Sequence, residues 1–249
     1  MTSFSIITVT RNNNAGLHRT ARSIANQTHK DYEWIIIDGD SQDSTKDYLK
    51  AQKMTQKWVS EPDDGLYDAM NKGLDLAEND YIIFMNSGDC FAHIKTLEHV
   101  TKPAVSQPAL IYGDSFELEN NNKLYPKRAK HINYKDALMT HHQSIYYNRR
   151  KIGSLRYNTA YKIAADYDFT QRFLKKTHDS AYIDSPLCIF EIGGVSMINH
   201  RHGRQETYKI RHNLKLVSPF HNKLIHGKQI IASFLRQYWP FFYRLLRRF

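Results

Sequence analysis

The chain of 249 residues has very little cysteine, which argues against the classes of protein held together by disulfides or structural zinc. Cys90 and Cys188 are its only two cysteines, and neither belongs to a C-x-x-C pair. Such spacing supports neither a disulfide framework nor a structural zinc site, and it is typical of a reducing cytosol. The first residues run into an apolar segment at Phe4 without a basic region or cleavage signal, so we do not expect secretion.

Two common nucleotide-binding motifs are also absent. The sequence contains neither G-x-x-x-x-G-K-[ST] nor G-x-G-x-x-G, which argues against P-loop and dinucleotide-binding folds. A nucleotidyltransferase would share an α/β sheet, but it needs a Gly-rich basic loop after its first strand. Residues 10–14, Thr-Arg-Asn-Asn-Asn, do not supply that loop.

The positive charge is concentrated in one segment. Residues 1–194 carry 24 Lys and Arg against 24 Asp and Glu, whereas residues 195–249 carry 11 against 1, which is the whole net charge of +10. A basic segment on a neutral body predicts an anionic partner, either a membrane or a nucleic acid. We expect no nucleic acid, because no recognised binding module accompanies the charge.

Strand and helix patterns alternate through the first half of the chain. The expected strands are residues 4–10, 32–37, 58–59 and 81–85, and the expected helices are residues 17–27, 44–53 and 66–77. Alternation of this kind predicts an α/β fold with a mostly parallel sheet flanked by helices. Beyond residue 108 we expect a hairpin of strands 109–116 and 123–125 around residues 120–122, a strand at 143–147 and a helix at 166–176.

Carboxylates follow three of the expected strands. Asp38, Asp63 and Asp89 each come where a strand stops, and ligands of open α/β sheets bind beyond the carboxyl ends of strands. Acids crowded at one edge are costly unless a cation or hydrogen-bond donors offset their charge. The pattern therefore favours a site for Mg²⁺ or Mn²⁺ and a diphosphate, although Asp89 taken alone could equally cap a helix.

Several ordered motifs resemble a known family. Residues 4–12 (FSIITVTRN), 23–28 (SIANQT), 36–45 (IIDGDSQDST) and 60–73 (SEPDDGLYDAMNKG) are similar to family 2 inverting glycosyltransferases of the GT-A fold, in the branch that builds bacterial surface polysaccharides. The similar stretches cover about residues 4–198. The resemblance implies a Rossmann-like sheet and a catalytic domain at residues 1–198, which uses a nucleotide-sugar donor, expected to be UDP-linked.

The resemblance also assigns roles at the donor side. Asp38 matches the acid that accepts a hydrogen bond from the donor's base, and Thr10, Asp63 and Asn71 fall where the family lines the nucleotide pocket. Asp89 matches the last acid of the metal motif and would hold Mg²⁺ or Mn²⁺.

On the acceptor side, Asp166 matches the late acid that serves as catalytic base. In an inverting transfer, this base removes the proton from the attacking hydroxyl on the face opposite the diphosphate. Asp168 is a rival for the role, and Asp166 as a helix N-cap is the structural alternative. His141, His142 and Gln143 resemble a segment near the acceptor, although either histidine could belong to the core. Residues 193–196 resemble a loop that closes over the site.

The chain departs from the family at two motifs. Asn86, Ser87 and Gly88 replace the acids that often precede Asp89, so metal binding could be weak or completed by His200 or His202. The Gln-x-x-Arg-Trp signature of processive synthases is absent, which favours addition of a single sugar to a hydroxyl of a lipid-linked saccharide. Alternatives are a polyprenyl-phosphate glycosyltransferase and a non-catalytic membrane adaptor on a decayed transferase fold.

The basic C-terminal segment, residues 199–249, has an amphipathic pattern. From Lys228 onward, apolar residues including Ile231 and Phe234 fall on one helical face and arginines on the other, and Pro240 interrupts the element. The charges within residues 229–246 argue against a spanning helix. We expect a helix that lies in the headgroup region of an anionic membrane, so that the protein is cytoplasmic and peripheral at the inner face of the cell membrane. A helix packed on the catalytic domain with a solvated basic face is the alternative.

Overall fold

The computed structural model describes residues 2–51, 57–119, 123–177, 179–193 and 199–239. The strands are β1 (Phe4–Thr10), β2 (Tyr32–Asp38), β3 (Lys57–Ser60), β4 (Tyr81–Phe84), β5 (Cys90–Phe91), β6 (Leu110–Leu118), β7 (Leu124–Lys127), β8 (Ile145–Asn148) and β9 (Ser180–Glu191). The helices are α1 (Asn14–Ala25), α2 (Thr45–Ala51), α3 (Leu66–Leu76), α4 (Thr96–Ala104), α5 (Arg149–Ile152), α6 (Ala165–Lys176), α8 (His200–Asn213) and α9 (Pro219–Tyr238), with a 3₁₀ turn, η1 (His142–Ser144), before β8.

The strands form one sheet in the order β3-β2-β1-β4-β8-β6-β9-β5, and β7 pairs with β6. The expected α/β fold is confirmed, and the first four strands are parallel. Beyond β4 the sheet is mixed, because β8 runs antiparallel to both β4 and β6. The expected hairpin is β6 with β7, and its turn at residues 120–122 lies outside the described residues.

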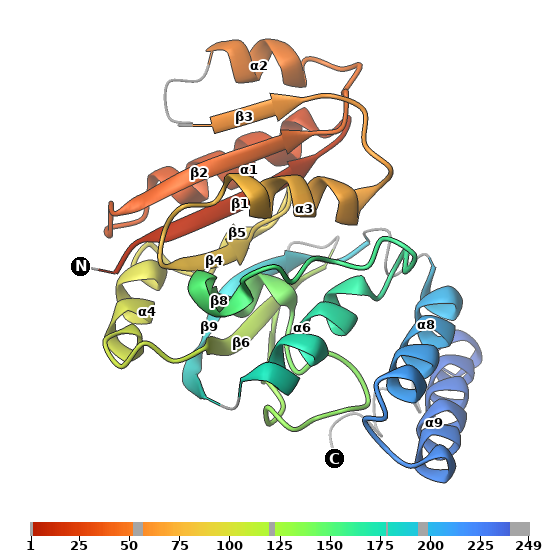
Figure 1. Ribbon diagram of the computed structural model, residues 1–249. Helices are drawn as coiled ribbons and strands as arrows, with labels where there is room; N and C mark the ends of the chain where they lie inside the picture. The colour runs from red at the N-terminus through yellow and green to blue at the C-terminus, as the bar shows by residue number, and fades with distance from the viewer. Residues whose placement is uncertain (1, 52–56, 120–122, 178, 194–198, 240–249) are drawn as a thin grey trace.

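Helices cover both faces of the sheet, as Figure 1 shows. Strand side chains alternate between the faces, so Ile7 and Val9 pack with α3 and α6, whereas Phe4 and Ile6 pack with α1, α2 and α4. Burial on both faces explains the continuous apolar runs of β1 and β4. The result is a three-layer core in which the polar strand ends are left at the sheet edge.

The carboxyl edge of the parallel strands collects the expected site residues. Thr10 pairs with Asp38, and Asp38 pairs with Ser60, so the ends of β1, β2 and β3 are level. β4 ends beside them, because Ile7 pairs with Phe84. Since β8 is antiparallel to β4, it begins at the same edge, and η1 lies there as well.

The first part of the basic segment packs on the rest of the fold. Ile210 of α8 lies in a small core with Ala164 and Tyr167 at the start of α6. Arg211 is fully buried, and its guanidinium donates to the Oδ1 of Asn222 at 2.7 Å. In the described part of the chain no helix is long and apolar enough to cross a bilayer. Pro240 and the residues after it lie outside the described residues.

Gly73 marks the close approach of α3 to the sheet, which yields a first prediction. A Cβ at this position would lie 2.4 Å from Cγ2 of Ile7, and the neighbouring core is tightly packed. Gly73→Ala is therefore expected to lower the free energy of unfolding in urea by about 1–3 kcal/mol. Gly227→Ala in α9 is the matched control, because nothing lies within 4 Å of its Cβ, and it should gain up to about 1 kcal/mol. Equal effects of the two substitutions would contradict the packing argument.

Candidate functional site

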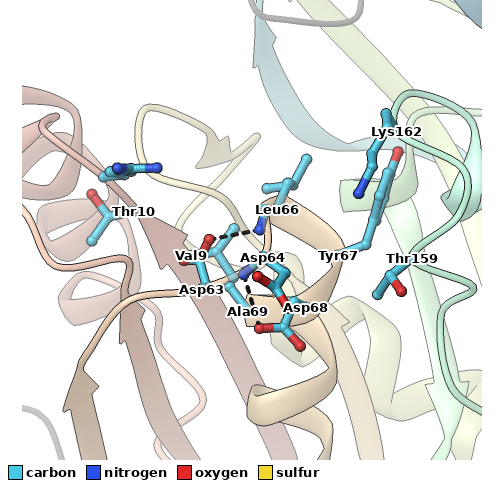
Figure 2. A pocket seen from close by; sticks show the side chains of 12 residues that line it. Val9, Thr10, Asp63, Asp64, Leu66, Tyr67, Asp68, Ala69, Thr159 and Lys162 are labelled. Carbon is cyan, nitrogen blue, oxygen red and sulfur yellow. Dashed lines mark hydrogen bonds between the residues drawn. The ribbon is translucent and has the colours of Figure 1, made fainter.

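A cavity of about 340 Å³ opens at the carboxyl edge of β1 and β3. Figure 2 shows Thr10 on one side of it, Asp63 and Asp64 in the middle, and Tyr67, Thr159 and Lys162 on the other side. The end of β1 and the segment from residue 63 to α3 supply most of the wall. The cavity thus lies where an open α/β sheet binds its ligand.

Thr10 and Asp63 both line this cavity. Within the described structure, Oγ1 of Thr10 is buried without a hydrogen-bond partner, so it is ready to bond a ligand. The Asp63 carboxylate accepts from the backbone N of Gly65 at 2.9 Å, and a Cβ at Gly39 would lie 2.3 Å from its Oδ2. Gly39 therefore lets Asp63 approach the end of β2, and nucleotide contact by Thr10 and Asp63 stays a prediction.

Asp38 and Asn71 are held behind the cavity wall. The Asp38 carboxylate is fully buried, accepts from Oγ of Ser60 at 2.7 Å and from N of Ser41 at 3.1 Å, and also accepts from the Ser41 hydroxyl. The Asn71 amide exchanges two hydrogen bonds with the backbone of Tyr157, at 2.8 and 3.0 Å. Neither residue lines the cavity. Their predicted nucleotide contacts remain predictions, and the contacts present show both fixing the surrounding loops.

Asp89 forms a second cluster at the same edge. Its Oδ2 accepts from Nε2 of Gln143 at 2.5 Å, and its Oδ1 accepts from the backbone N of Glu191 at 3.3 Å. Burial raises the pKa of Asp89 from 3.8 to about 6, although the Gln143 hydrogen bond and the nearby His142 oppose the rise. Glu191 is also ion-paired with Arg19 at 2.5 Å. The predicted metal ligand thus lies among polar and charged side chains from three elements, η1, β9 and α1.

His142 connects this cluster to Asp166. Its Nε2 lies 3.2 Å from Nδ2 of Asn86, and its Nδ1 lies 3.7 Å from Oδ2 of Asp166. Asn86 follows β4 and Asp166 is the second residue of α6, so His142 spans the gap between the sheet edge and this helix. The structure brings the predicted base and the predicted metal strand to opposite sides of one imidazole.

His141 points into a different environment. It stacks on Phe190 with ring centroids 4.2 Å apart, and its Nε2 lies 3.2 Å from both Glu117 Oε1 and Lys127 Nζ. Burial lowers the pKa of His141, although the Glu117 carboxylate opposes the shift. Of the three residues predicted for the acceptor side, Gln143 contacts Asp89 and His142 faces Asp166, whereas His141 belongs to the β6–β7–β9 packing.

The two candidate bases differ in their surroundings. Asp168 is buried, and its carboxylate is ion-paired with Arg172 at 2.6 Å, four residues along the same helix. Asp166 is partly exposed and faces His142. Its Oδ1 accepts from the backbone N of Tyr167 at 2.7 Å. Asp166 is therefore the more accessible of the two carboxylates, and its role as the base stays a prediction.

The side chains around Asp89 offer oxygen atoms that could hold a divalent cation. In the described part of the chain no three His, Cys, Asp or Glu side chains gather to form a metal site. His202 contacts Glu206 at 3.0 Å instead, and His200 is exposed at the start of α8. Buried amide oxygens of Asn86 and Gln143 have no hydrogen-bond partner in the described structure. Carboxylate and amide oxygens suit Mg²⁺ or Mn²⁺, which commonly takes one or two carboxylates plus substrate phosphates, so the residues fit.

Some residues of the site were not found from the sequence. Glu191 ends β9 at the same edge as Asp89, and the rule of acids at strand ends would have found it had β9 been recognised. Tyr67 and Lys162 line the cavity, and the hydroxyl of Tyr67 donates to the backbone O of Ile163 at 2.7 Å. Lys162 has no sequence signal except that it lies four residues before Asp166.

Comparisons with known proteins agree with this geometry. The family model described as "Glycosyl transferase family 2" matches residues 5–182. A PGL/p-HBAD biosynthesis glycosyltransferase of Mycobacterium bovis is 33% identical over 177 residues, which cover 68% of each chain. The poly(ribitol-phosphate) beta-N-acetylglucosaminyltransferase TarP of Staphylococcus aureus is 31% identical over 133 residues, which cover 51% of this chain and 40% of TarP.

Solved structures of glycosyltransferases share the fold. TarS 1–349 of S. aureus in complex with UDP-GlcNAc superposes with a TM-score of 0.70 at 16% identity, covering 96% of this chain and 73% of TarS 1–349. A mannosyltransferase of Pyrobaculum calidifontis, in complex with GDP-Man and Mn²⁺, gives a TM-score of 0.68 at 12% identity, covering 92% of this chain and 69% of the other. The chain belongs to glycosyl transferase family 2 and is a glycosyltransferase with a GT-A type fold.

Proposed function

We propose that this enzyme transfers a single sugar, with inversion, from a UDP-linked donor to a hydroxyl of a lipid-linked saccharide in bacterial polysaccharide biosynthesis. The observation that carries the proposal is the pair of contacts made by His142, with Asn86 at 3.2 Å and with Asp166 at 3.7 Å. With Asp166 as the base, its carboxylate would lie across His142 from the segment after β4 that bears Asp89. An inverting displacement needs this opposition of base and leaving group.

The donor nucleotide is assigned to the cavity beside Thr10 and Asp63. Thr10, whose buried hydroxyl has no partner in the described structure, and Asp63, whose side chain is partly exposed, both line this space, and Arg11 and Lys162 add positive charge for a diphosphate. Asp38, through its bonds to Ser41 and Ser60, would hold the loops that receive the base. The structural neighbours with UDP-GlcNAc and GDP-Man support a nucleotide-sugar as donor.

Mg²⁺ or Mn²⁺ is assigned to Asp89, together with the donor's diphosphate. When bound, such an ion would neutralise the negative charge that grows on the leaving diphosphate. The protein's part is to hold the carboxylate: Gln143 donates to it, and the backbone N of Glu191 restrains its other oxygen.

Asp166 is assigned to the proton transfer. It lies in the first turn of α6, and its partly exposed carboxylate faces His142. Its Oδ2, on the side of His142, would accept the proton of the acceptor hydroxyl as the new bond forms. The imidazole of His142 orients this oxygen and closes one side of the acceptor site.

The proposal is tested by measuring nucleotide release and product stereochemistry. The purified enzyme is incubated with a panel of UDP- and GDP-sugars, with and without Mn²⁺, and with synthetic polyprenyl-diphosphate saccharides as acceptors. We expect UDP release that depends on the acceptor and a product with inverted anomeric configuration by NMR. Transfer to polyprenyl phosphate alone would support the alternative acceptor, and no release with any donor would overturn the proposal in favour of an adaptor.

We further propose that α9 binds the anionic membrane that carries the acceptor. Phe220, Ile231 and Phe234 are 72%, 61% and 55% exposed on this helix, and Lys223 and Lys228 lie on the same element. Exposed apolar residues beside lysines suit the headgroup region, where the chains bury apolar area and the charges meet anionic lipids. The net charge of the segment supports the same partner.

A flotation assay tests the membrane proposal. The variant Ile231→Ser/Phe234→Ser is expected to reduce recovery with vesicles of phosphatidylcholine and phosphatidylglycerol about tenfold, because two half-exposed apolar side chains no longer enter the bilayer. Val105→Ser is the control, since Val105 is 82% exposed just beyond α4 and should leave flotation unchanged. Equal recovery of wild type and double variant would refute the assignment.

A further inference from the structure

Glu206 is an exception in its own segment. It is the single acidic residue among residues 195–249, where 11 residues are basic, yet it is only 4% exposed. Removing a carboxylate from water is costly unless hydrogen bonds or opposite charges offset the loss. A buried acid in a basic segment therefore calls for a specific set of partners.

Those partners are the backbone amides that lead into α6. Oε1 of Glu206 accepts from N of Lys162 at 2.7 Å, and Oε2 accepts from N of Ile163 at 2.9 Å and N of Ala164 at 2.8 Å. Ala164 is the N-cap residue of α6, and its methyl group cannot cap the helix. All three amides precede the first turn of α6, so the carboxylate of Glu206 fixes the backbone that leads into the helix. His202 adds a contact at 3.0 Å from the solvent side.

The segment that Glu206 holds lies between two parts of the candidate site, the cavity and the start of α6. Lys162 lines the cavity, and Asp166 lies two residues after Ala164, the last residue whose amide bonds Glu206. Tyr67, which also lines the cavity, fixes the same segment from the other direction by donating to the backbone O of Ile163 at 2.7 Å. α8 approaches so closely that a Cβ at Gly203 would lie 3.0 Å from Cγ2 of Ile163.

We propose that Glu206 is a positioning residue for catalysis: it anchors residues 162–164 to α8 and so sets Asp166 against His142 and Lys162 against the cavity. The proposal rests on the assignment of Asp166 as base. On this proposal α8, at the start of the basic segment, positions residues of the active site, whereas α9 remains the element assigned to the membrane. Three charge-assisted hydrogen bonds to consecutive amides leave this backbone little freedom.

Glu206→Gln tests this role with little change in side-chain size. Because Gln presents an NH₂ where Glu presents its second oxygen, at least one of the three amides loses its acceptor and faces a donor. We expect kcat to fall about 10- to 100-fold, as displacement of a catalytic group by about 1 Å would produce, and the donor KM to rise by a smaller factor through the displacement of Lys162. Thr10 and Asp63, on the far wall of the cavity, are untouched by the change.

Ile210→Ala is the matched control for stability. Ile210 is fully buried between α8 and α6, so its truncation loosens the same interface and lowers Tm without removing the carboxylate. Hydrogen exchange followed by mass spectrometry gives a readout that does not depend on activity. Glu206→Gln should speed exchange of the amides of residues 162–164 more than Ile210→Ala does at the same loss of Tm. If Glu206→Gln folds poorly, Glu206→Asp takes its place, and its shorter carboxylate should speed exchange in the same segment.

Failure of the positioning role and failure of the base assignment give different results. If Asp166→Asn is inactive but Glu206→Gln matches Ile210→Ala in kcat and exchange, Glu206 is only structural and the inference is overturned. If Asp166→Asn keeps wild-type activity, the base assignment fails, whatever Glu206 does. Slow turnover together with fast exchange in Glu206→Gln alone supports the positioning role.

Discussion

Replacing Asp166 by asparagine is expected to lower kcat for sugar transfer by about 1,000-fold, within the range that a general base contributes. The amide keeps the size of the side chain and the contact with the backbone N of Tyr167, but it cannot take the acceptor's proton. Affinity for UDP, measured by calorimetry, should stay within about threefold of wild type, because Asp166 does not line the nucleotide cavity.

Asp168→Asn is the control for this experiment. Its carboxylate is buried against Arg172 and points away from the His142 side, so the substitution should cost stability by weakening an ion pair. Burial raises the pKa of Asp168, which the Arg172 contact opposes. Transfer at 25 °C should remain close to wild type. Loss of turnover in Asp168→Asn with full activity in Asp166→Asn would reverse our assignment of the base.

Replacing Asp89 by asparagine is expected to weaken Mn²⁺-supported binding of UDP about 100-fold. The neutral amide removes the carboxylate that we assign to the cation, and loss even of outer partners of a metal typically costs 10- to 100-fold. Since the pKa of Asp89 is about 6, wild-type affinity should rise as the pH goes from 5 to 7 and the carboxylate ionises. The variant should lose this rise.

The same substitution should make the ligand-free protein more stable. The folded pKa of Asp89 lies above the usual 3.8, so the fold binds this proton more tightly than the unfolded chain does. Stability then falls as the pH rises from about 4 through about 6, by about 3 kcal/mol in all at neutral pH. Asp89→Asn should raise Tm at pH 7.5 but not at pH 4. An unchanged Tm at pH 7.5, with unchanged UDP affinity, would show that Asp89 neither bears this cost nor holds the ion.

Much of the part of the fold to which we assign the donor, β1 to β4 with their helices, was predictable from the sequence. The alternation of apolar runs and amphipathic stripes fixed β1 to β4 and their helices, because two-sided burial leaves a clear pattern. Since parallel strands end at one edge of a sheet, the sequence alone predicts that the acids after these strands lie at the same edge. The roles of Asp38 and Asn71 were less accessible, because their hydrogen bonds go to Ser60 and Tyr157, which are distant in sequence.

The part of the fold to which we assign the acceptor depends on strand pairings that cannot be predicted from local sequence patterns. His142 meets Asn86 and Asp166 only because β8 inserts antiparallel between β4 and β6. Nothing in the local sequence around residue 206 indicates that a carboxylate there would bond the backbone amides of residues 162–164. The expected boundary at residue 198 follows the charge distribution, yet α8 packs on α6, because burial of Ile210 does not depend on the sign of nearby charges.

The ladder between β4 and β8 is short, with pairs Tyr81–Asn148 and Ile82–Tyr147. It joins the portion of the fold to which we assign the donor to the portion to which we assign the base and the acceptor. Gln143 reaches across this seam to Asp89. An ancestral enzyme could therefore exchange the second portion, and with it the choice of acceptor, while keeping its donor, provided that a residue at position 143 still met the carboxylate at the end of β4.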